Sequence, residues 1–339
     1  MRISDLGEFG LIRNIRRLSL RKTSTALIGI GDDAAALRVA SSRILLATTD
    51  MLLEEVHFDL SFTDLYSLGW KSAAVNLSDI AAMGGSPSHC LTALGIPENI
   101  SVEQIEDFYR GLTGLLKAHR TTLVGGDTCH SGKGMVISVT VLGEVEKKNL
   151  LSRAGARPGD RVFVTGTLGG SAAGLEILKN MARGKGEKGK GEEARRLIAE
   201  HLRPVPRTAE GRAIARSGCA SAMIDISDGL SSDLAHICEQ SGVGAEIHSD
   251  RIPLSPALLK LSSGLTMPLL NYALSGGEDY ELLFTVPPGK LKKLQSLHIP
   301  VTEIGAVKRR KALMLVDDTG RKNTLQATGY EHFRRMKIT

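Results

Sequence analysis

Residues 74–84 read Ala-Val-Asn-Leu-Ser-Asp-Ile-Ala-Ala-Met-Gly, and a second glycine follows. The apolar spacing around this stretch predicts a helix from Asp64 to Met83 that ends at the glycine pair. Asp79 would then lie near the helix C-terminus, where the macrodipole disfavours an anion. Its neighbours are Ala, Leu, Ile and Val, which solvate a carboxylate poorly. A bound cation would resolve both problems, so this helix predicts a binding function as well as a packing one.

Elsewhere, β-branched and apolar runs alternate with longer segments of helical spacing, which predicts an α/β or α+β fold. Strands are expected at Arg43–Thr49, Thr121–Val124, Met135–Val145, Arg161–Thr165 and Leu282–Val286. Further helices are expected at Val102–His119, Ser171–Met181 and Ser231–Ser241.

The chain length predicts two domains, because 339 residues exceed the roughly 250–300 that one core accommodates. The best boundary is the polar stretch from Glu146 to Gly159, where Arg157-Pro-Gly-Asp160 is a turn signature before a strand. We therefore expect an N-terminal domain of residues 1–147 and a C-terminal domain of residues 148–339. The Gly/Lys/Glu-rich segment 183–192 is too polar to bury and predicts an exposed, mobile loop between two helices.

Composition excludes several classes of function. The net charge is +6 and the pI about 9.1, but the basic residues are scattered and not interleaved with aromatics, so a nucleic-acid partner is not expected. Anionic small molecules fit better. The 4 cysteines show no metal-finger spacing and suggest reduced, intracellular thiols. No apolar run resembles a signal peptide or approaches the ~18 residues of a membrane span, so a cytoplasmic protein without membrane contact is expected.

Two glycine-rich segments imitate nucleotide-binding motifs. Gly184 to Lys190 has the spacing of a P-loop, but Gly191 stands where the magnesium-binding Ser or Thr belongs, and no strand precedes it. Gly29-Ile-Gly31-Asp-Asp33-Ala34 matches the relaxed dinucleotide fingerprint. However, two adjacent carboxylates would repel a pyrophosphate unless cations intervened. We reject both motifs, and the repulsion in the second one points to metal binding.

The most unusual short segments pair an acidic residue with Gly, Ser or Thr at expected strand or helix ends. They contain Asp32-Asp33, Thr48-Thr49-Asp50, Asp79, Gly126-Asp127, Asp225-Ile-Ser-Asp228 and Glu278-Asp279. Mg²⁺ takes hard oxygen ligands and prefers few carboxylates together with phosphates and water. If these segments converge, they would bind a metal–nucleotide complex rather than a bare metal.

Each segment also has an ordinary structural explanation. Asp32-Asp33 is compatible with a solvated turn, and a turn Asp is common at the positions of Asp50 and Asp127. Asp228 could cap the helix that follows it, and a lone histidine such as His57 is more often structural than functional. The sequence contains no serine nucleophile elbow and no zinc motif. Phosphoryl transfer needs neither, since it depends mainly on positioning and charge neutralisation.

These segments, in this order, resemble bacterial thiamine-monophosphate kinases of the aminoimidazole ribonucleotide synthetase superfamily. The resemblance covers nearly the whole chain, and its most specific stretches are Asn76-Leu-Ser-Asp79 and Ser275-Gly-Gly-Glu-Asp-Tyr-Glu-Leu282. Other matching stretches are Gly29–Ala34, Thr48–Asp50, His57-Phe58, Leu123–Thr128, Ser152–Asp160, Val164–Thr167, His201–Pro204, Asp225–Gly229 and Gly329–Phe333.

The resemblance implies a homodimer in which the sheets of the N-terminal domains form a barrel across the dimer, and a C-terminal α/β domain. It implies that ATP binds with several Mg²⁺ ions and that its γ-phosphate passes in line to thiamine monophosphate, giving thiamine diphosphate. Magnesium ligands would be Asp33, Thr48, Thr49, Asp50, Asp79, Asp127, Asp225 and Asp228. Among them Asp50, Asp127 and Asp228 would act in catalysis. ATP contacts would come from Gly126, Asp127, Arg153 and Ser227, and contacts with the thiamine substrate from His57, Glu278 and Tyr330.

Three of these residues also have alternative explanations. A guanidinium such as that of Arg153 matches phosphate oxygens, but an arginine before a turn is also common on a surface. Glu278 could cap a turn, and Tyr330 could be a half-buried core residue as well as a ring that stacks on a flat heterocycle. Ala327 and Thr328 stand where the family often has an aromatic residue.

Two other functions stay open at this point. One is another ATP-dependent synthetase of the superfamily. Within it, selenophosphate synthetase is disfavoured because it needs a reactive residue near the N-terminus, whereas the first cysteine here is Cys90. The other is a nucleotide-sensing module without turnover.

Overall fold

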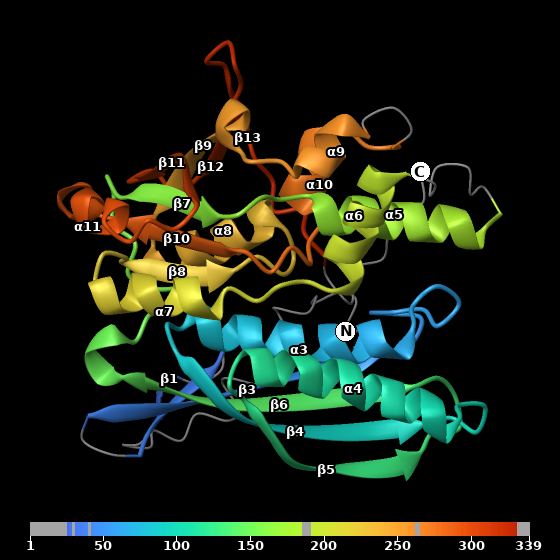
Figure 1. Ribbon diagram of the computed structural model, residues 1–339. Helices are drawn as coiled ribbons and strands as arrows, with labels where there is room; N and C mark the ends of the chain where they lie inside the picture. Colours follow the sequence, from blue (N-terminus) through green and yellow to red (C-terminus); the bar gives the residue numbers. More distant parts are fainter. Residues whose placement is uncertain (1–25, 29–30, 40–41, 185–190, 262–264, 331–339) are drawn as a thin grey trace, which may run out of the picture.

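The computed structural model describes residues 26–28, 31–39, 42–184, 191–261 and 265–330. In this part of the chain two mixed sheets of 6 and 7 strands are stacked with helices between and around them (Figure 1). The fold is of the mixed α/β type that the sequence predicts. Among the described residues, none of the helices has both the length and the apolar composition for a membrane crossing.

The first sheet has the strand order β1-β2-β3-β6-β4-β5, in which only β4 and β5 run parallel. Its strands are β1 (Ala26–Ile28), β2 (Ala35–Arg38), β3 (Arg43–Leu53), β4 (Ser86–Ile96), β5 (Thr122–His130) and β6 (Val136–Glu146). Helices α3 (Leu65–Ala82) and α4 (Val102–Ala118) cover one face. In β6 the side chains alternate between buried and half-buried, as expected for a sheet with one covered face.

The second sheet has the order β13-β12-β9-β11-β7-β10-β8. Its strands are β7 (Arg161–Thr165), β8 (Ala222–Asp225), β9 (Gly244–His248), β10 (Leu282–Val286), β11 (Val301–Lys308), β12 (Leu313–Val316) and β13 (Lys322–Thr324). Its helices are α5 (Gly170–Ala182), α6 (Glu192–Leu202), α7 (Thr208–Ser217), α8 (Leu230–Ser241), α9 (Pro256–Lys260), α10 (Leu269–Ser275) and α11 (Leu291–Gln295). Every residue of β10 is buried, as expected for a strand with both faces covered.

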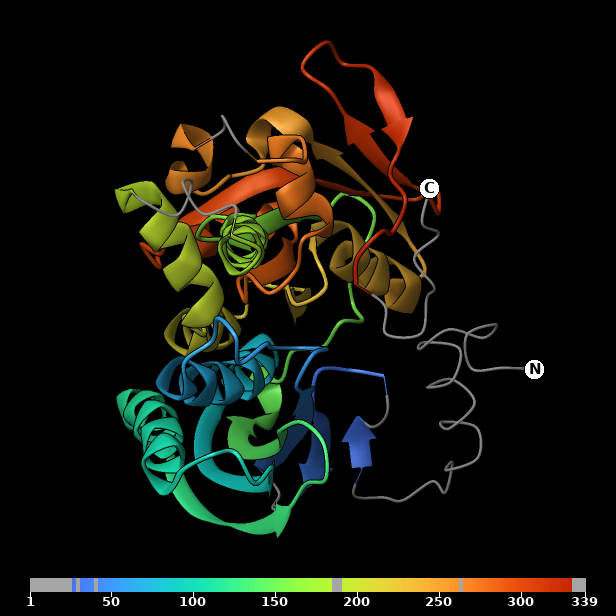
Figure 2. The same cartoon turned by 90° about the vertical axis from the view of Figure 1, so that its right-hand side faces the viewer.

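Helix α3 connects the two halves of the molecule. It packs on β3, β6 and α4 of the first half and on α7 and β8 of the second. Both views show it between the first sheet and the second half (Figures 1 and 2). Asp64 caps its N-terminus by accepting a hydrogen bond from the N–H of Ser67 at 2.8 Å, and Asp79 lies in its last turn. The position predicted for Asp79 is therefore confirmed.

The predicted strands and helices are all present, and β3 and β5 extend beyond their predicted C-terminal ends. The boundary at residues 147 and 148 stays a prediction, because the two halves share cores. Tyr280 packs in the core of the first half, and Ala81 and Ala82 pack with Phe163 of the second. The polar loop of residues 183–192 lies between α5 and α6, but its residues 185–190 are outside the described part, as are Gly29 and Ile30 of the rejected dinucleotide-like motif.

Two glycines allow α3 and α4 to cross closely. A Cβ atom on Gly69 would lie 1.9 Å from the carbonyl oxygen of Phe108, and a Cβ on Gly111 would lie 1.9 Å from that of Tyr66. Backbone atoms cannot yield to such contacts as a flexible side chain can. Gly114, one turn further along α4, is exposed and would place its Cβ no closer than 3.7 Å from any neighbour.

We therefore expect opposite effects from two matched substitutions in α4. Gly111→Ala should lower the free energy of unfolding by about 1–3 kcal/mol, because it forces the helices apart. Gly114→Ala should leave it unchanged or raise it by up to about 1 kcal/mol through helix propensity. Denaturant unfolding of both variants measures the difference, and equal effects would contradict the close crossing.

Candidate active site

Three carboxylates from separate segments meet at the C-terminal end of α3. Asp33 precedes β2, Asp79 lies in the last turn of α3, and Asp225 ends β8. One ligand atom from each lies within 4.8 Å of the others. Asp33 and Asp225 are buried and Asp79 is half-buried. Since α3 packs between β3 and β8, its last turn brings the acids of both halves together.

Asp50 joins this group from the first sheet. Side chains alternate along β3, so Thr48 and Asp50 share the face that α3 covers. The Thr48 hydroxyl donates a hydrogen bond to Asp79 Oδ2. Burial, followed by the charge of Asp33, raises the pKa of Asp50 to about 6.

Burial and mutual repulsion both disfavour negative charge in this carboxylate group. Burial, reinforced by neighbouring carboxylates, raises the pKa values of Asp79 and Asp225 well above the ordinary range. The Ser78 hydroxyl donates to Asp225 Oδ2 at 2.7 Å, but one hydroxyl does not balance several charges. Asp33 Oδ2 is buried and has no hydrogen-bond partner among the described residues. Carboxylate and hydroxyl oxygens with unmet charge are a donor set that suits Mg²⁺.

Arg153 faces the same acids. Its Nη2 and Nε donate to Asp33 Oδ1 at 2.6 and 3.2 Å, and its backbone N–H donates to Asp32 Oδ2 at 3.3 Å. Burial and the charge of Asp33 raise the pKa of Asp32 to about 7. The alternative of an ordinary surface arginine is therefore wrong, since the Arg153 side chain is only 18% exposed.

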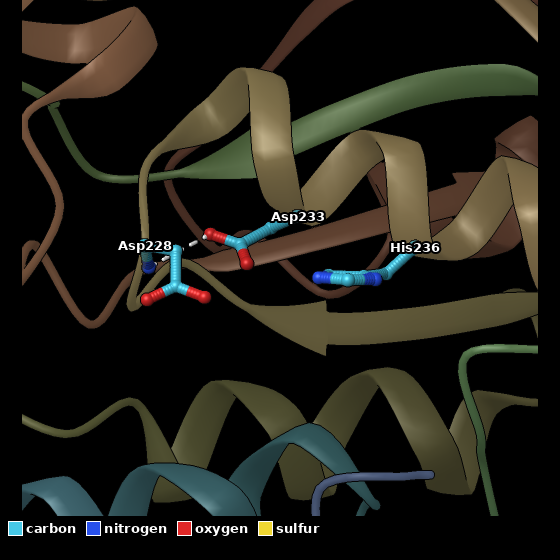
Figure 3. A group of neighbouring side chains, drawn as sticks. All are labelled: Asp228, Asp233 and His236. Atoms are coloured by element: carbon cyan, nitrogen blue, oxygen red, sulfur yellow. Dashed lines mark hydrogen bonds between the residues drawn. The ribbon is translucent and has the colours of Figure 1, made fainter. Parts of the chain in front are cut away.

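A second group contains Asp228, Asp233 and His236 (Figure 3). Asp233 Oδ2 accepts hydrogen bonds from the N–H groups of Asp228 and Gly229, at 3.2 and 3.1 Å. Gly229 occupies the N-cap position of α8, so the alternative in which Asp228 caps this helix is wrong. The Asp228 carboxylate instead lies beside Asp233 and His236.

Two of the residues predicted for the thiamine substrate, Glu278 and His57, lie near Lys71 of α3. Glu278 Oε1 is 2.7 Å from Lys71 Nζ, and its Oε2 is 3.4 Å from His201 Nδ1. Burial alone would raise the pKa of Glu278, but neighbouring positive charge, that of Lys71 first, holds it below its ordinary value. His57 accepts a hydrogen bond from the N–H of Leu53 at 3.0 Å and is close enough to Glu278 to affect its charge.

Ser227 and Tyr330 belong to the surroundings of Asp228. The N–H of Glu278 donates to the Ser227 carbonyl at 2.8 Å, and the N–H of Tyr330 donates to the Asp228 carbonyl at 3.2 Å. Tyr330 is 46% exposed, so part of its surface is accessible beside Asp228. These contacts place the C-terminal segment next to the Asp228 group.

Three predicted residues do not join the carboxylate group within one chain. Thr49 is exposed on the opposite face of β3 from Asp50 and donates to the Val139 carbonyl at 3.2 Å. Gly126 and the exposed Asp127 lie on β5, three strand positions from β3 in the sheet order, which corresponds to about 14 Å. A Cβ on Gly126 would lie 1.9 Å from the Thr92 carbonyl oxygen, which explains this glycine by packing alone.

The sequence assigned no role to four residues beside these sites, Lys71, His201, Asp233 and His236, and it indicated Asp32 only as part of the Asp32-Asp33 pair. Lys71 carried a signal, because a lysine within an apolar helical run, eight residues before Asp79, lies on the same face of the helix. His201 begins the stretch His201–Pro204, which resembles the family but implied no role for His201. Asp233 and His236 carried no signal, since they have ordinary helical spacing.

Comparisons with known proteins agree with this geometry. Residues 31–145 match the family described as "AIR synthase related protein, N-terminal domain", and residues 157–318 match "AIR synthase related protein, C-terminal domain". The chain is 37% identical over 336 residues to a thiamine-monophosphate kinase of Bacillus subtilis, covering 97% of this chain and 100% of the relative. It is 40% identical over 333 residues to one of Aquifex aeolicus, covering 98% and 100%.

The chain belongs to the thiamine-monophosphate kinase family. A solved structure described as "AaThiL complexed with AMPPCP and TMP" superposes with a TM-score of 0.86 at 38% identity, covering 98% of this chain and 99% of that one. The resemblance noted in the sequence is thus confirmed over nearly the full length. The fold of this family is shared by both halves of the described chain.

The raised pKa values predict a pH-dependent stability of the metal-free protein. Asp50 and Asp32 titrate near pH 6 and 7 in the folded chain, against 3.8 for an unperturbed Asp. The folded state therefore keeps protons that the unfolded state has lost, and the free energy of unfolding should fall as the pH rises from about 4 to about 7.

Mg²⁺ should reverse this loss, because it binds the ionised carboxylates of the folded state. Melting temperatures measured with chelator and with MgCl₂ should differ little at pH 5 and clearly at pH 8. Asp79→Asn should reduce both the pH slope and the gain from Mg²⁺. A gain that is independent of pH would contradict metal binding at these carboxylates.

Proposed function

We propose that this chain transfers the γ-phosphate of ATP directly and in line to the phosphate of thiamine monophosphate, giving ADP and thiamine diphosphate, with several Mg²⁺ ions. The observation that carries the proposal is the convergence of Asp33, Asp79 and Asp225, with Asp50 beside them, from both halves of the chain. Full-length similarity to named thiamine-monophosphate kinases supports the choice of substrate.

The carboxylates would hold magnesium, which neutralises the phosphate oxygens as charge develops on them. Thr48 and Asp50 lie on the side of the first sheet, and Asp228 on the side of the second. Arg153, whose planar fork matches phosphate oxygens, orients the nucleotide phosphates from the same side as Asp33. The acceptor is itself an anionic phosphate, so the site needs no strong protein base.

The substrate ring would lie toward Glu278, His57 and Tyr330. Glu278 is ionised and held from two sides, and Tyr330 is exposed beside Asp228. Lys71, which pairs with Glu278, is eight residues before Asp79 on α3. These two positions are about 12 Å apart along the helix axis. Along α3, phosphate chemistry at Asp79 and ring recognition at Glu278 would thus be separated, with Tyr330 approaching the ring from beside Asp228.

The direct test is turnover by the purified full-length chain. With ATP, thiamine monophosphate and MgCl₂ we expect ADP and thiamine diphosphate in equal amounts, and chelator should stop the reaction. Nucleotide binding without ADP formation would favour a sensing module. ADP formation only with a different acceptor would favour another synthetase of the superfamily.

Asp50→Asn should reduce turnover by at least about a hundredfold, because it removes a ligand charge without changing the size of the side chain. Its circular dichroism spectrum should match that of the wild type. Asp107→Asn is a suitable control, since this carboxylate lies on α4 with a side chain 48% exposed and pairs only with Arg110 among the described residues. Normal turnover of Asp50→Asn at saturating Mg²⁺ would exclude the role of Asp50.

We further propose that the chain acts as a homodimer and that Asp127 serves the site of the second copy. Asp127 is aligned across the first sheet with Ala93, Ser138 and Met51, and Met51 is 57% exposed. This row faces away from α3. A barrel in which the β5 edge of one copy lies beside the β1–β2 edge of the other would bring Asp127 toward the partner's carboxylates.

Mixed dimers test this arrangement. Asp50→Asn and Asp127→Asn should each be inactive alone, because every site lacks one residue. After the two variants are denatured and refolded together, half the dimers are mixed, and one of the two sites in each is intact. About a quarter of the wild-type activity should then return. No recovery, although mixed dimers form, would place both residues in the same chain's site.

A further inference from the structure

We propose that Lys71, together with His201, is a positioning residue that fixes the carboxylate of Glu278 for the ring end of the substrate. The inference rests on the proposed function, and it adds two residues that the sequence motifs left without a role. Both residues are buried, with 2% and 3% of their surface exposed, so neither serves as a solvated surface charge.

The contacts engage both oxygens of Glu278. Lys71 Nζ lies 2.7 Å from Oε1, and His201 Nδ1 lies 3.4 Å from Oε2. Lys71 Nζ is also 3.5 Å from His201 Nε2, and His201 Nδ1 is 3.1 Å from Ser171 Oγ. The four residues come from α3, α5, α6 and the segment before β10. A carboxylate held from several elements has little rotational freedom.

The backbone of Glu278 is fixed separately. Its N–H donates to the Ser227 carbonyl at 2.8 Å, and that of Tyr280 donates to the Ile226 carbonyl at 2.9 Å. Glu278 and Tyr280 have φ values of 59° and 51°, a left-handed conformation that costs energy for residues other than glycine. The segment is thus tied to the chain that bears Asp225 and Asp228, and the direction of the Glu278 side chain is set by Lys71 and His201.

Lys71 also supplies the balancing charge. The titratable groups that face Glu278 are Lys71, His201 and His57. Burial, and then the charge of Lys71, lowers the pKa of His201 to about 3, so His201 is neutral at physiological pH and acts as a polar contact. Without Lys71, the largely buried Glu278 carboxylate would lose the cation that pairs with it. Its ionised form would then be less favourable, and its side chain would be less well fixed.

A purely structural role is the competing explanation, because Lys71 links the two halves of the chain. Arg212 offers a matched comparison. It also crosses between the halves, with Nη2 2.6 Å from Glu146 and Nη1 3.3 Å from the Gly84 carbonyl, but it contacts none of the proposed site residues. If the only role of Lys71 were to link the halves, then loss of Lys71 and loss of Arg212 should have the same effect on stability and kinetics.

The experiment compares steady-state kinetics of the full-length variants Lys71→Met, His201→Gln and Arg212→Met. We expect Lys71→Met to raise the KM for thiamine monophosphate by about tenfold or more. The substitution removes the charged contact to Glu278, which is the residue proposed to bind the substrate. The KM for ATP should stay within about twofold. His201→Gln should show the same pattern more weakly, and Arg212→Met should lower the melting temperature without changing the ratio of the two KM values.

A double-mutant cycle shows whether Lys71 acts through Glu278. Lys71→Met combined with Glu278→Gln should have the kinetics of Glu278→Gln alone, within about twofold. This double variant carries no buried unpaired charge, so it answers the question even if Lys71→Met folds poorly.

Three results would overturn the assignment: a proportional change of both KM values in Lys71→Met, the same ratio change in Arg212→Met, or a further tenfold loss in the double variant. A wild-type chain that forms no thiamine diphosphate would overturn the proposed function itself. An active wild type with unchanged Lys71→Met kinetics would overturn only the role of Lys71.

Discussion

Repulsion among buried carboxylates at the C-terminal end of α3 is the constraint on which the rest of the structure depends. Asp33, Asp79 and Asp225 each place a carboxylate oxygen within 4.8 Å of the others. Burial, reinforced by neighbouring carboxylates, raises the pKa values of Asp79 and Asp225. Helix α3 adds to the cost, since its last turn carries an acid and no base. A chain selected for stability alone would place Asn or an apolar residue here, so the arrangement indicates a cation and its phosphate ligand.

The fold that creates this group follows from local signals. The apolar run that ends at Gly84 and Gly85 fixes α3, and Asp64 caps its start. The regular strands, β7 and β10 for example, were predictable to the residue because they combine β-branched composition with clear flanking turns. The ends of β3 and β5 were not, because Asp50 interrupts the apolar pattern of β3, and Gly125, Gly126 and Asp127 interrupt that of β5. These ends are held by pairing with β6 and β4 rather than by propensity.

The site was predictable only as far as its residues carry a signal of their own. Asp79 could be identified because a carboxylate among apolar neighbours is unusual, and Asp225 because it lies in the acidic segment Asp225-Ile-Ser-Asp228. Lys71 is likewise unusual as a positive charge within an apolar helical run, but its partner Glu278 lies more than 200 positions away in the sequence. No local pattern encodes that pairing. Asp127 is the opposite case. Its Gly-Gly-Asp-Thr motif is clear in the sequence, but its strand β5 lies three positions from β3, away from the carboxylates of the same chain.

The two halves of the chain are therefore joined by ionic contacts that respond differently to ligands. Lys71 and Glu278 attract each other across the boundary without any bound group. Asp79 and Asp225 face each other across the same boundary and repel until a cation or a proton intervenes. The boundary between the halves therefore combines an attractive pair, Lys71 and Glu278, with a carboxylate pair whose negative charge a bound cation would neutralise.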